Sequence, residues 1–407
     1  MSGLKHIVFL ALLPALGWAA PDEAALGKAE GYPVCALTRG GTGPDRCLVG
    51  LFSHFDQVYP ARKVAHGAKI HALRRAPAEP AIAYWYQGQG QARSLEAFLD
   101  RTRTTGLLIL QGDTILVERY LYDRTAQHRF QSQSMAKTVV AMLVGIAVSE
   151  GLIKSIDDRA ERYVAELRGS PYGETRLRHL LTMSSGMKFQ EEYSETDDNA
   201  TLNGKTYRQE GRGGADTVAE FRTRENPPGT KFHYASADTQ VLALALRAAV
   251  GRPLAEYLSE KIWQPMGAEA DATWLIDAGG YEVGYVGLNC TLRDWGRLGL
   301  LLANGGAIDG RQIVPADWVR AMTTPDAPHL RVGAASRFSG YGYQTWLIDA
   351  QEPYFALLGI RGQAIVVDPK TKLVMVVTAV NTLNDLAARI EQYSLFYGAL
   401  YSLKPKT

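Results

Sequence analysis

Ser134 and Lys137 form the serine–lysine pair of this sequence that is best placed for nucleophilic chemistry. They begin an apolar run that extends to residue 150 and predicts a buried helix ending before Gly151. A spacing of three residues places both side chains on one face of that helix. The first turn of a helix offers free N–H groups and a partial positive charge, which can stabilise an oxyanion. Burial in this field lowers the pKa of a lysine, so that Lys137 could accept the proton of Ser134.

The pattern Ser-x-x-Lys also occurs at Ser2/Lys5 and Ser185/Lys188, because so short a motif arises by chance. The first copy lies in a leader-like segment, and the second is followed by a polar stretch with no helix to hold the pair. The motif at Ser134 has a second interpretation as well. The serine could merely cap the helix while the lysine reaches out to solvent.

A tyrosine is the second element that could take part in proton transfer. Tyr234 lies in the segment 228–236, directly before a helix predicted over 241–250. Its hydroxyl, held beside a lysine, could relay a proton to a leaving group. A tyrosine standing alone is more often an ordinary half-buried residue, so Tyr234 depends on its combination with the serine–lysine pair.

Four motifs, in this order along the chain, together resemble the serine β-lactamase and penicillin-binding protein family, on its class C branch. They are Ser-Met-Ala-Lys at 134–137, the helix-and-turn stretch 178–186, Tyr-Ala-Ser at 234–236 and the stretch 287–306. The likeness covers residues 100 to 402. Within the family, the chain most resembles the 6-aminohexanoate-oligomer hydrolases, through 236–239, Gly362-Gln363 and the loop 187–198.

The resemblance implies roles for individual residues. Ser134 would be the nucleophile, with Lys137 and Tyr234 handling its proton, and which of the two is the base stays open. The N–H groups of Ser134 and Gln363 would stabilise the oxyanion, and Ser236 would bind substrate. The implied reaction is hydrolysis of a small amide or ester through an acyl-enzyme, on a linear amide such as a 6-aminohexanoate oligomer, without a cofactor.

The third catalytic element of the family departs from its pattern. Class C β-lactamases carry Lys-Thr-Gly on the strand that faces the nucleophile, whereas this chain has Gly-Ile-Arg-Gly-Gln at 359–363. Arg361 could bind a substrate carboxylate through two hydrogen bonds, or it could be a surface charge. The loss of Lys-Thr-Gly argues against a dedicated β-lactamase.

The loop 187–198 is strongly acidic. If it lines the cleft, its carboxylates could hold an ammonium group of an amide substrate; otherwise most of them are solvated charges. Tyr193 is the member of this loop that we expect to reach the substrate.

The elements around these residues predict an α/β protein of β-lactamase-like architecture. A hairpin is expected at 107–110 and 114–121, helices at 254–263 and 294–303, strands at 342–348, 363–367 and 372–380, and a last helix at 384–401. Strands at both ends with helices between them predict one antiparallel sheet built from both termini. We divide the chain into a signal peptide (1–20), an N-terminal extension that wraps the main body (21–95) and a hydrolase domain (96–402) with a mainly helical insert (155–285). A ligand cleft is expected between the sheet and the insert.

The first residues indicate export to the periplasm or beyond. Lys5 precedes an apolar run at 7–16 and small residues at 19–20, which is typical of a cleaved signal peptide and leaves no stable membrane anchor. In an exported protein, Cys35 and Cys47 are close enough in sequence to form a disulfide. Cys290 is expected to be a buried apolar residue and not a nucleophile.

Composition narrows the remaining classes. A net charge of +2 with scattered basic residues argues against nucleic-acid binding. No Gly-x-Ser-x-Gly elbow and no His-Glu-x-x-His pattern occurs, which disfavours an α/β-hydrolase and a metalloenzyme. Three alternatives stay open: a carboxylesterase, a D-alanyl peptidase or penicillin-binding protein, and a non-catalytic binding protein on this fold.

Overall fold

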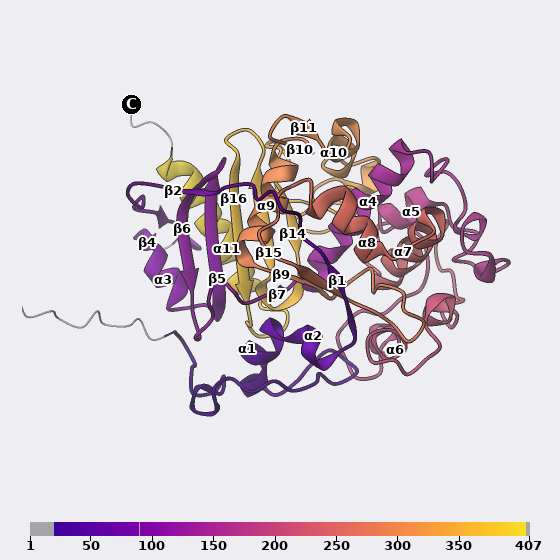
Figure 1. The fold of residues 1–407 in the computed structure, drawn as a ribbon, viewed down its shortest axis with the longest axis horizontal. Helices are drawn as coiled ribbons and strands as arrows, with labels where there is room; N and C mark the ends of the chain where they lie inside the picture. The colour runs from indigo at the N-terminus through magenta and orange to yellow at the C-terminus, as the bar shows by residue number, and fades with distance from the viewer. Residues whose placement is uncertain (1–19, 89, 404–407) are drawn as a thin grey trace, which may run out of the picture.

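The structure is a computed structural model that describes residues 20–88 and 90–403 (Figure 1). The predicted signal peptide, apart from Ala20, lies outside the described residues. In the described part of the chain, no helix combines the length and the apolar character needed to cross a bilayer.

The main sheet has eight strands in the order β12-β13-β14-β15-β16-β5-β6-β2. All neighbours are antiparallel except β2 and β6, which run parallel. Strand β5 pairs with β16 near the centre, so the sheet joins an early and a late part of the chain, as predicted. In chain order the strands are β2 (Arg74–Arg75), β5 (Thr104–Gln111), β6 (Thr114–Tyr120), β12 (Gly340–Tyr341), β13 (Trp346–Leu347), β14 (Phe355–Leu358), β15 (Ala364–Asp368) and β16 (Leu373–Ala379).

Helices cover both faces of this sheet, which explains why its central strands read as continuous apolar runs. On one face lies α9 (Leu292–Ala303), and on the other lie α3 (Leu95–Leu99) and α11 (Leu386–Ser402). Helix α9 approaches the sheet closely because two of its glycines, Gly296 and Gly299, face the sheet. A Cβ on Gly296 would lie 2.7 Å from Leu108 Cδ2, and one on Gly299 would lie 2.4 Å from Val374 Cγ1.

The mainly helical part lies beside the sheet, on the right of Figure 1. The helix predicted from Ser134 is a 3-10 turn, η2 (Gln133–Met135), followed by α4 (Ala136–Ser149). Helix α7 (Ser236–Val250) packs against α4 and begins five residues before the predicted start at 241. The other helices are α5 (Leu177–Leu181), α6 (Asp198–Lys205), α8 (Leu254–Leu258) with a π-turn η6 (Ser259–Trp263), and α10 (Ala316–Met322). Short 3-10 turns are η1 (Lys28–Glu30), η3 (Ala160–Arg162), η4 (Ala165–Leu167), η5 (Gly214–Val218), η7 (Pro328–Leu330) and η8 (Ile360–Gly362).

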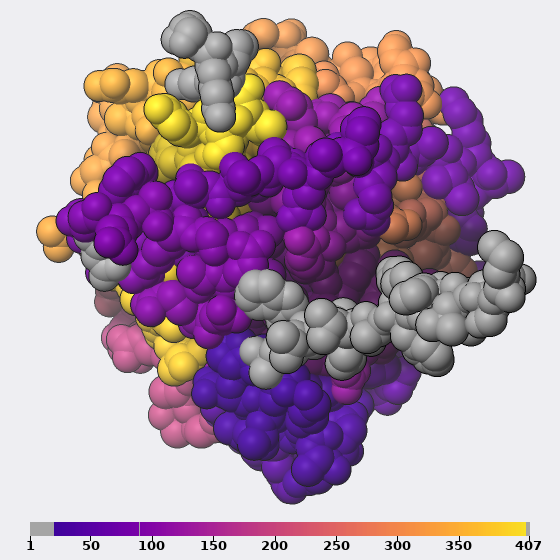
Figure 2. Space-filling model, turned by 90° about the vertical axis from the view of Figure 1, so that its left-hand side faces the viewer, coloured from indigo at the N-terminus to yellow at the C-terminus, as the bar shows by residue number. Residues whose placement is uncertain are grey.

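The N-terminal extension is built into the body of the molecule. Its strand β1 (Ala61–Val64) joins a second sheet in the order β1-β8-β9-β7, with β8 (Ala272–Leu275), β9 (Leu288–Cys290) and β7 (Phe130–Gln131). It also contributes α1 (Asp45–Ser53), α2 (Phe55–Val58), β2 and the hairpin β3–β4 (Ala83–Tyr84 and Arg93–Ser94). A last hairpin is β10–β11 (Ala307–Ile308 and Arg311–Gln312). Figure 2 shows indigo and purple residues of the N-terminal part of the chain across the middle and lower part of one face, with yellow and orange residues of the C-terminal part above them.

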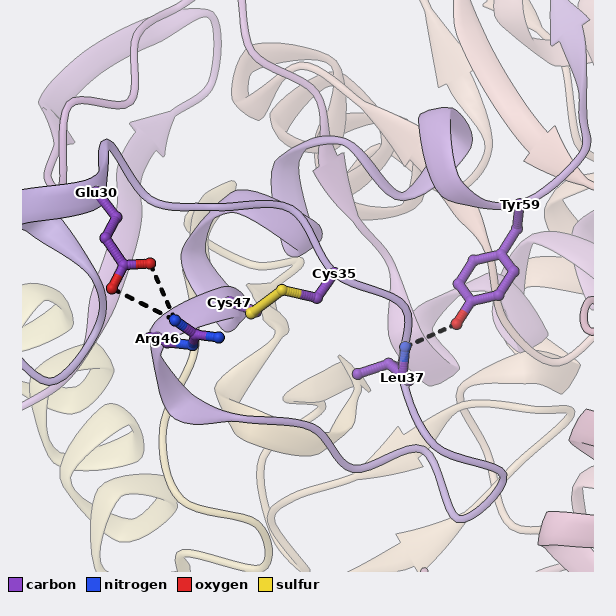
Figure 3. The surroundings of a disulfide bond; sticks show 6 residues. All are labelled: Glu30, Cys35, Leu37, Arg46, Cys47 and Tyr59. Atoms are coloured by element: carbon purple, nitrogen blue, oxygen red, sulfur yellow. Dashed lines mark hydrogen bonds and ion pairs between the residues drawn. A yellow bond between two sulfur atoms is a disulfide. The ribbon is translucent and has the colours of Figure 1, made fainter.

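The cysteines are arranged as the sequence suggested. Cys35 and Cys47 form a disulfide with their Cα atoms 5.6 Å apart, and it ties the chain ahead of α1 to that helix (Figure 3). Cys290 is a buried free thiol on β9, and burial raises its pKa well above the usual range. A thiol of raised pKa is a poor nucleophile.

Candidate active site

Strand β7 and the turn after it position Ser134. Beyond the β7–β9 pairing, the Ser132 N–H donates a 2.8 Å hydrogen bond to the Leu288 carbonyl, and the Leu288 N–H donates to Ser132 Oγ at 3.1 Å. Gln133 has φ +44°, which is unusual for a residue other than glycine. Its N–H donates to Gln131 Oε1 at 2.5 Å. These contacts fix the entry into η2, so the Ser134 hydroxyl is held at a defined point before α4.

Lys137 contacts the hydroxyl of Ser134. Its Nζ lies 2.7 Å from Ser134 Oγ and donates to the Tyr285 carbonyl at 3.3 Å. The side chain is 1% exposed, and burial lowers the pKa of Lys137 to about 8, against an opposing effect of the Glu191 charge. A lysine that loses its proton this easily can act as a base near neutral pH.

Tyr234 lies on the other side of Lys137. The lysine Nζ is 4.9 Å from the centroid of the Tyr234 ring, which stacks on Trp346 at 5.5 Å with 23° between the planes. Burial raises the pKa of Tyr234 above its usual range, as does the nearby Glu191 charge, while a hydrogen bond with Ser134 opposes the rise. A phenol with a raised pKa keeps its proton, so Tyr234 is better suited to donating a proton than to removing one.

Ser134 lies between two hollows of different size. The outer hollow has a volume of about 360 Å³ and is lined by Tyr234, Trp346, Arg361, Asp385 and Arg389, among others. The inner hollow has a volume of about 30 Å³ and is lined by Leu37, Gly41, Phe55, Glu191, Tyr207 and Tyr285, among others. Ser134, Tyr193 and Ile360 line both hollows. The site therefore lies between the sheet and the helical part, and the extension closes one side of it.

Glu191 is the carboxylate of the acidic loop that faces the site. The Ser236 N–H and Oγ each donate to it at 2.8 Å, and the Tyr193 hydroxyl donates at 3.3 Å. Ser236 is 1% exposed and lines the inner hollow, where its hydroxyl gives its hydrogen to Glu191 and keeps its oxygen as an acceptor. Tyr193 reaches both hollows, as expected for a residue that contacts substrate.

The other acidic side chains of this loop have structural partners. Asp197 accepts a 2.7 Å hydrogen bond from the Ala200 N–H and so caps α6. Glu195 accepts hydrogen bonds from the N-terminal extension. Asp197 and Glu195 are therefore held by structural contacts, whereas Glu191 lines the inner hollow.

Arg361 is buried, with 7% of its surface exposed, so the surface-charge interpretation is wrong. Its Nη1 donates to the Asn381 carbonyl at 3.1 Å, and its Nε has no hydrogen-bond partner within the described residues. Burial lowers the pKa of the guanidinium. The residue lines the outer hollow, where a substrate acceptor could meet it.

Gln363 is buried further along the same segment. Its side-chain amide donates to the Ala379 carbonyl at 2.5 Å and to the Ile360 carbonyl at 3.3 Å, and the residue is not among those that line either hollow. The part of this segment closest to the nucleophile lies earlier. A Cβ on Gly359 would be 2.7 Å from Gln133 Cβ, and the next residue, Ile360, lines both hollows.

Several residues of the site are not signalled by the sequence. Trp346 stacks on the ring of Tyr234, and the Tyr285 carbonyl accepts a hydrogen bond from Lys137. Neither residue belongs to a sequence motif. Leu37, Gly41 and Phe55 come from the extension, where the cysteine pair is the only local sign of an ordered structure. Among residues 20–88 and 90–403, no group of three or more His, Cys, Asp or Glu side chains is arranged to hold a metal ion.

Comparison with known proteins identifies the family. The sequence model of the beta-lactamase family matches residues 92–394. The chain belongs to the beta-lactamase family. This confirms the resemblance inferred from the four motifs and the β-lactamase-like α/β fold. The family match begins close to the end of the extension, so residues 20–91 lie outside it.

Two kinds of relative accompany this family match. A 6-aminohexanoate-dimer hydrolase of Paenarthrobacter ureafaciens is 31% identical over 314 residues, which are 74% of this chain and 80% of that protein. A solved Bacillus anthracis protein, provisionally named a 6-aminohexanoate-dimer hydrolase, superposes with a TM-score of 0.78 at 24% identity, covering 89% of this chain and 96% of the other. A penicillin-binding protein from Bacillus halodurans gives a TM-score of 0.59 at 19% identity, covering 74% and 100%. The beta-lactamase-family chain is therefore a hydrolase of this fold.

Proposed function

We propose that this hydrolase cleaves a small amide or ester through an acyl-enzyme on Ser134. The observation that carries the proposal is the 2.7 Å contact between Ser134 Oγ and the buried amine of Lys137, whose pKa is lowered to about 8. The same contact argues against a non-catalytic binding protein, because such a protein gains nothing from a buried, partly neutral lysine beside a hydroxyl.

In the acylation step, Ser134 Oγ forms a bond to the substrate carbonyl carbon while its proton passes to Lys137. The bond from that carbon to the leaving amine or alcohol then breaks, and the leaving group takes up a proton from Tyr234, which recovers one from Lys137. Because the three groups are in contact, their protonation is coupled: Lys137 receives the serine proton and Tyr234 passes a proton on to the leaving group.

In the deacylation step, a water oxygen bonds to the acyl carbon and the ester bond to Ser134 Oγ breaks. The proton of the water passes to the lysine–tyrosine pair and then returns to the serine oxygen. The products are a carboxylic acid and the free hydroxyl of Ser134, so the cycle needs no cofactor.

The oxyanion of both steps requires two N–H donors. One is the Ser134 N–H at the start of η2. For the second, we replace the predicted Gln363 by Ile360, because Ile360 lines both hollows next to the nucleophile and Gln363 lines neither. The donor then comes from the first residue of η8, two residues after the end of β14.

For the substrate, we propose a linear amide such as a 6-aminohexanoate oligomer, on the strength of the 31% identical relative. A carboxylesterase is the second candidate, favoured by the aromatic wall of Tyr234 and Trp346 in the outer hollow. We further propose export to the periplasm or the medium, which the Cys35–Cys47 disulfide supports because such bonds persist in oxidising compartments.

The test is intact-protein mass spectrometry after treatment with a fluorophosphonate. We expect one adduct on the parent protein and none on Ser134→Ala. Ser185→Ala, which alters the second Ser-x-x-Lys motif of the main body, is the matched control and should keep the adduct. A folded parent protein without an adduct would refute the serine mechanism, while an adduct opens a screen of short amides, esters and penicillins.

A further inference from the structure

The segment 35–47, which we call the strap, forms one wall of the active site although it precedes the family domain. The Cys35–Cys47 disulfide closes it into a loop (Figure 3). Leu37 and Gly41 within this loop line the inner hollow beside Ser134. Phe55, just after the strap, lines the same hollow. The extension therefore does more than support the fold.

Polar contacts fasten the strap to the acidic loop. Glu195 accepts hydrogen bonds from Thr38 Oγ1 at 2.6 Å, from Thr42 Oγ1 at 3.0 Å and from the Gly40 N–H at 3.2 Å. The backbones touch at Gly40, where an added Cβ would lie 2.6 Å from the Ser194 carbonyl oxygen. The contact leaves no room for a side chain.

Three further side chains bind backbone atoms of the strap at Leu37 and Arg39. The Arg208 guanidinium donates to the Leu37 carbonyl at 2.5 Å, and Asn203 Nδ2 donates to the Arg39 carbonyl at 3.1 Å. The Tyr59 hydroxyl accepts a 2.8 Å hydrogen bond from the Leu37 N–H, as Figure 3 shows. Because other residues bind several backbone N–H and carbonyl groups of the strap, its position and shape are fixed.

The position of Tyr234 decides which part of a substrate meets this wall. The leaving group takes its proton from Tyr234, and Tyr234 lines the outer hollow but not the inner one. The leaving group therefore occupies the outer hollow, and the acyl group points from Ser134 into the inner hollow. At about 30 Å³, against about 360 Å³ for the outer hollow, the inner hollow is much the smaller of the two.

We propose that the strap is a specificity-determining element that limits the acyl group of the substrate to a short chain while leaving groups of larger size are accepted. This inference rests on the proposed function and adds to it the size selection on the acyl side. The 6-aminohexanoyl group of the oligomer proposed above as a substrate is longer than the seated strap allows, so its hydrolysis requires the strap to move away from the acidic loop.

The experiment compares p-nitrophenyl acetate, butyrate and hexanoate, whose leaving group is constant and whose acyl group grows. Gly40→Ala inserts a methyl group between strap and loop, at a glycine whose φ is not positive. Gly43→Ala is the matched control in the same strap, because its new methyl group meets only the flexible end of Leu37 at 3.3 Å. Glu195→Gln, which weakens the three hydrogen bonds, is a second and gentler way to release the strap.

We expect the parent protein to favour acetate over hexanoate by about tenfold or more in kcat/KM, since the pocket wall rejects added methylenes. Gly40→Ala and Glu195→Gln should lower that ratio about fivefold or more through faster hexanoate hydrolysis, while Gly43→Ala keeps the parent ratio. A parent that hydrolyses all three esters equally, or released variants that keep the parent ratio, would overturn the inference and leave the serine mechanism standing. A parent that hydrolyses no ester or amide and gives no fluorophosphonate adduct would overturn both.

Discussion

The two sides of the nucleophile are built in opposite ways. On the α4 side, Ser134 and Lys137 are three residues apart, and a single helical turn sets their 2.7 Å contact. On the strap side, the wall comes from residues more than 80 positions earlier, and contacts with a loop more than 150 positions later hold it in place. The comparison indicates that the proposed chemistry depends on local structure, whereas the proposed substrate selection depends on tertiary contacts.

The substitution Ser134→Ala is the strongest test of the proposed chemistry on the α4 side. We expect kcat/KM to fall roughly 10⁴-fold or more, because the attacking atom is removed and only substrate binding and the oxyanion donors remain. Thermal unfolding should be almost unchanged, since the half-buried hydroxyl is not part of the core. Hydrolysis within tenfold of the parent level would show that another group attacks the carbonyl.

Lys137→Met removes the amine and keeps the volume of the apolar stem. The expected loss is about 10³-fold in kcat/KM, the size of a missing general base. The control is Lys188→Met, which changes the exposed lysine of the other Ser-x-x-Lys motif and should leave the rate unchanged. Equal effects of the two substitutions would mean that the motif at 134–137 is not special.

The pH dependence of kcat/KM tests the environment of that lysine. Lys137 acts as a base only when neutral, so the rate should rise with pH and level off above about 8, the pKa that burial gives this lysine. Glu191→Gln removes a charge that raises the pKa of Lys137, so the inflection should move to lower pH. Glu192→Gln, its exposed neighbour, is the control and should leave the inflection in place. An upward shift in Glu191→Gln would contradict the assignment of the titrating group.

The smallest effect on the chemistry is expected for the strap disulfide. In Cys35→Ser/Cys47→Ser, the free energy of unfolding should fall by about 3 kcal/mol, because the unfolded chain regains the freedom of a short closed loop. Urea titration measures this change, and the parent protein in reducing buffer serves as the control. Hydrolysis of a short acyl ester should persist within about threefold, since α4 needs no support from the strap. Loss of Ser134 labelling in the folded variant would break the division between the two sides.

Much of the fold can be predicted because apolar periodicity reports burial directly. The hairpin β5–β6, the strands β15 and β16 and the helices α4, α9 and α11 lie where apolar runs and helix-ending residues place them. Boundaries shift where turns intervene, as at Ser236, which begins α7 five residues before the apolar run becomes evident. The extension has no periodicity, and its strands β1 and β2 form because β8 and β6 offer them edges, while β3 and β4 pair with each other.

The sequence by itself determined the contact between Ser134 and Lys137, since both lie within one turn of a helix whose apolar run is visible. It also indicated the family and the disulfide. Only the tertiary structure showed that Ser236 donates a hydrogen bond to Glu191 and that Arg361 is buried. It also moved the proposed oxyanion donor from Gln363 to Ile360 and made the strap a wall of the site. The physical reason is range: helical spacing fixes neighbours within four residues, whereas these contacts depend on how distant segments pack against one another.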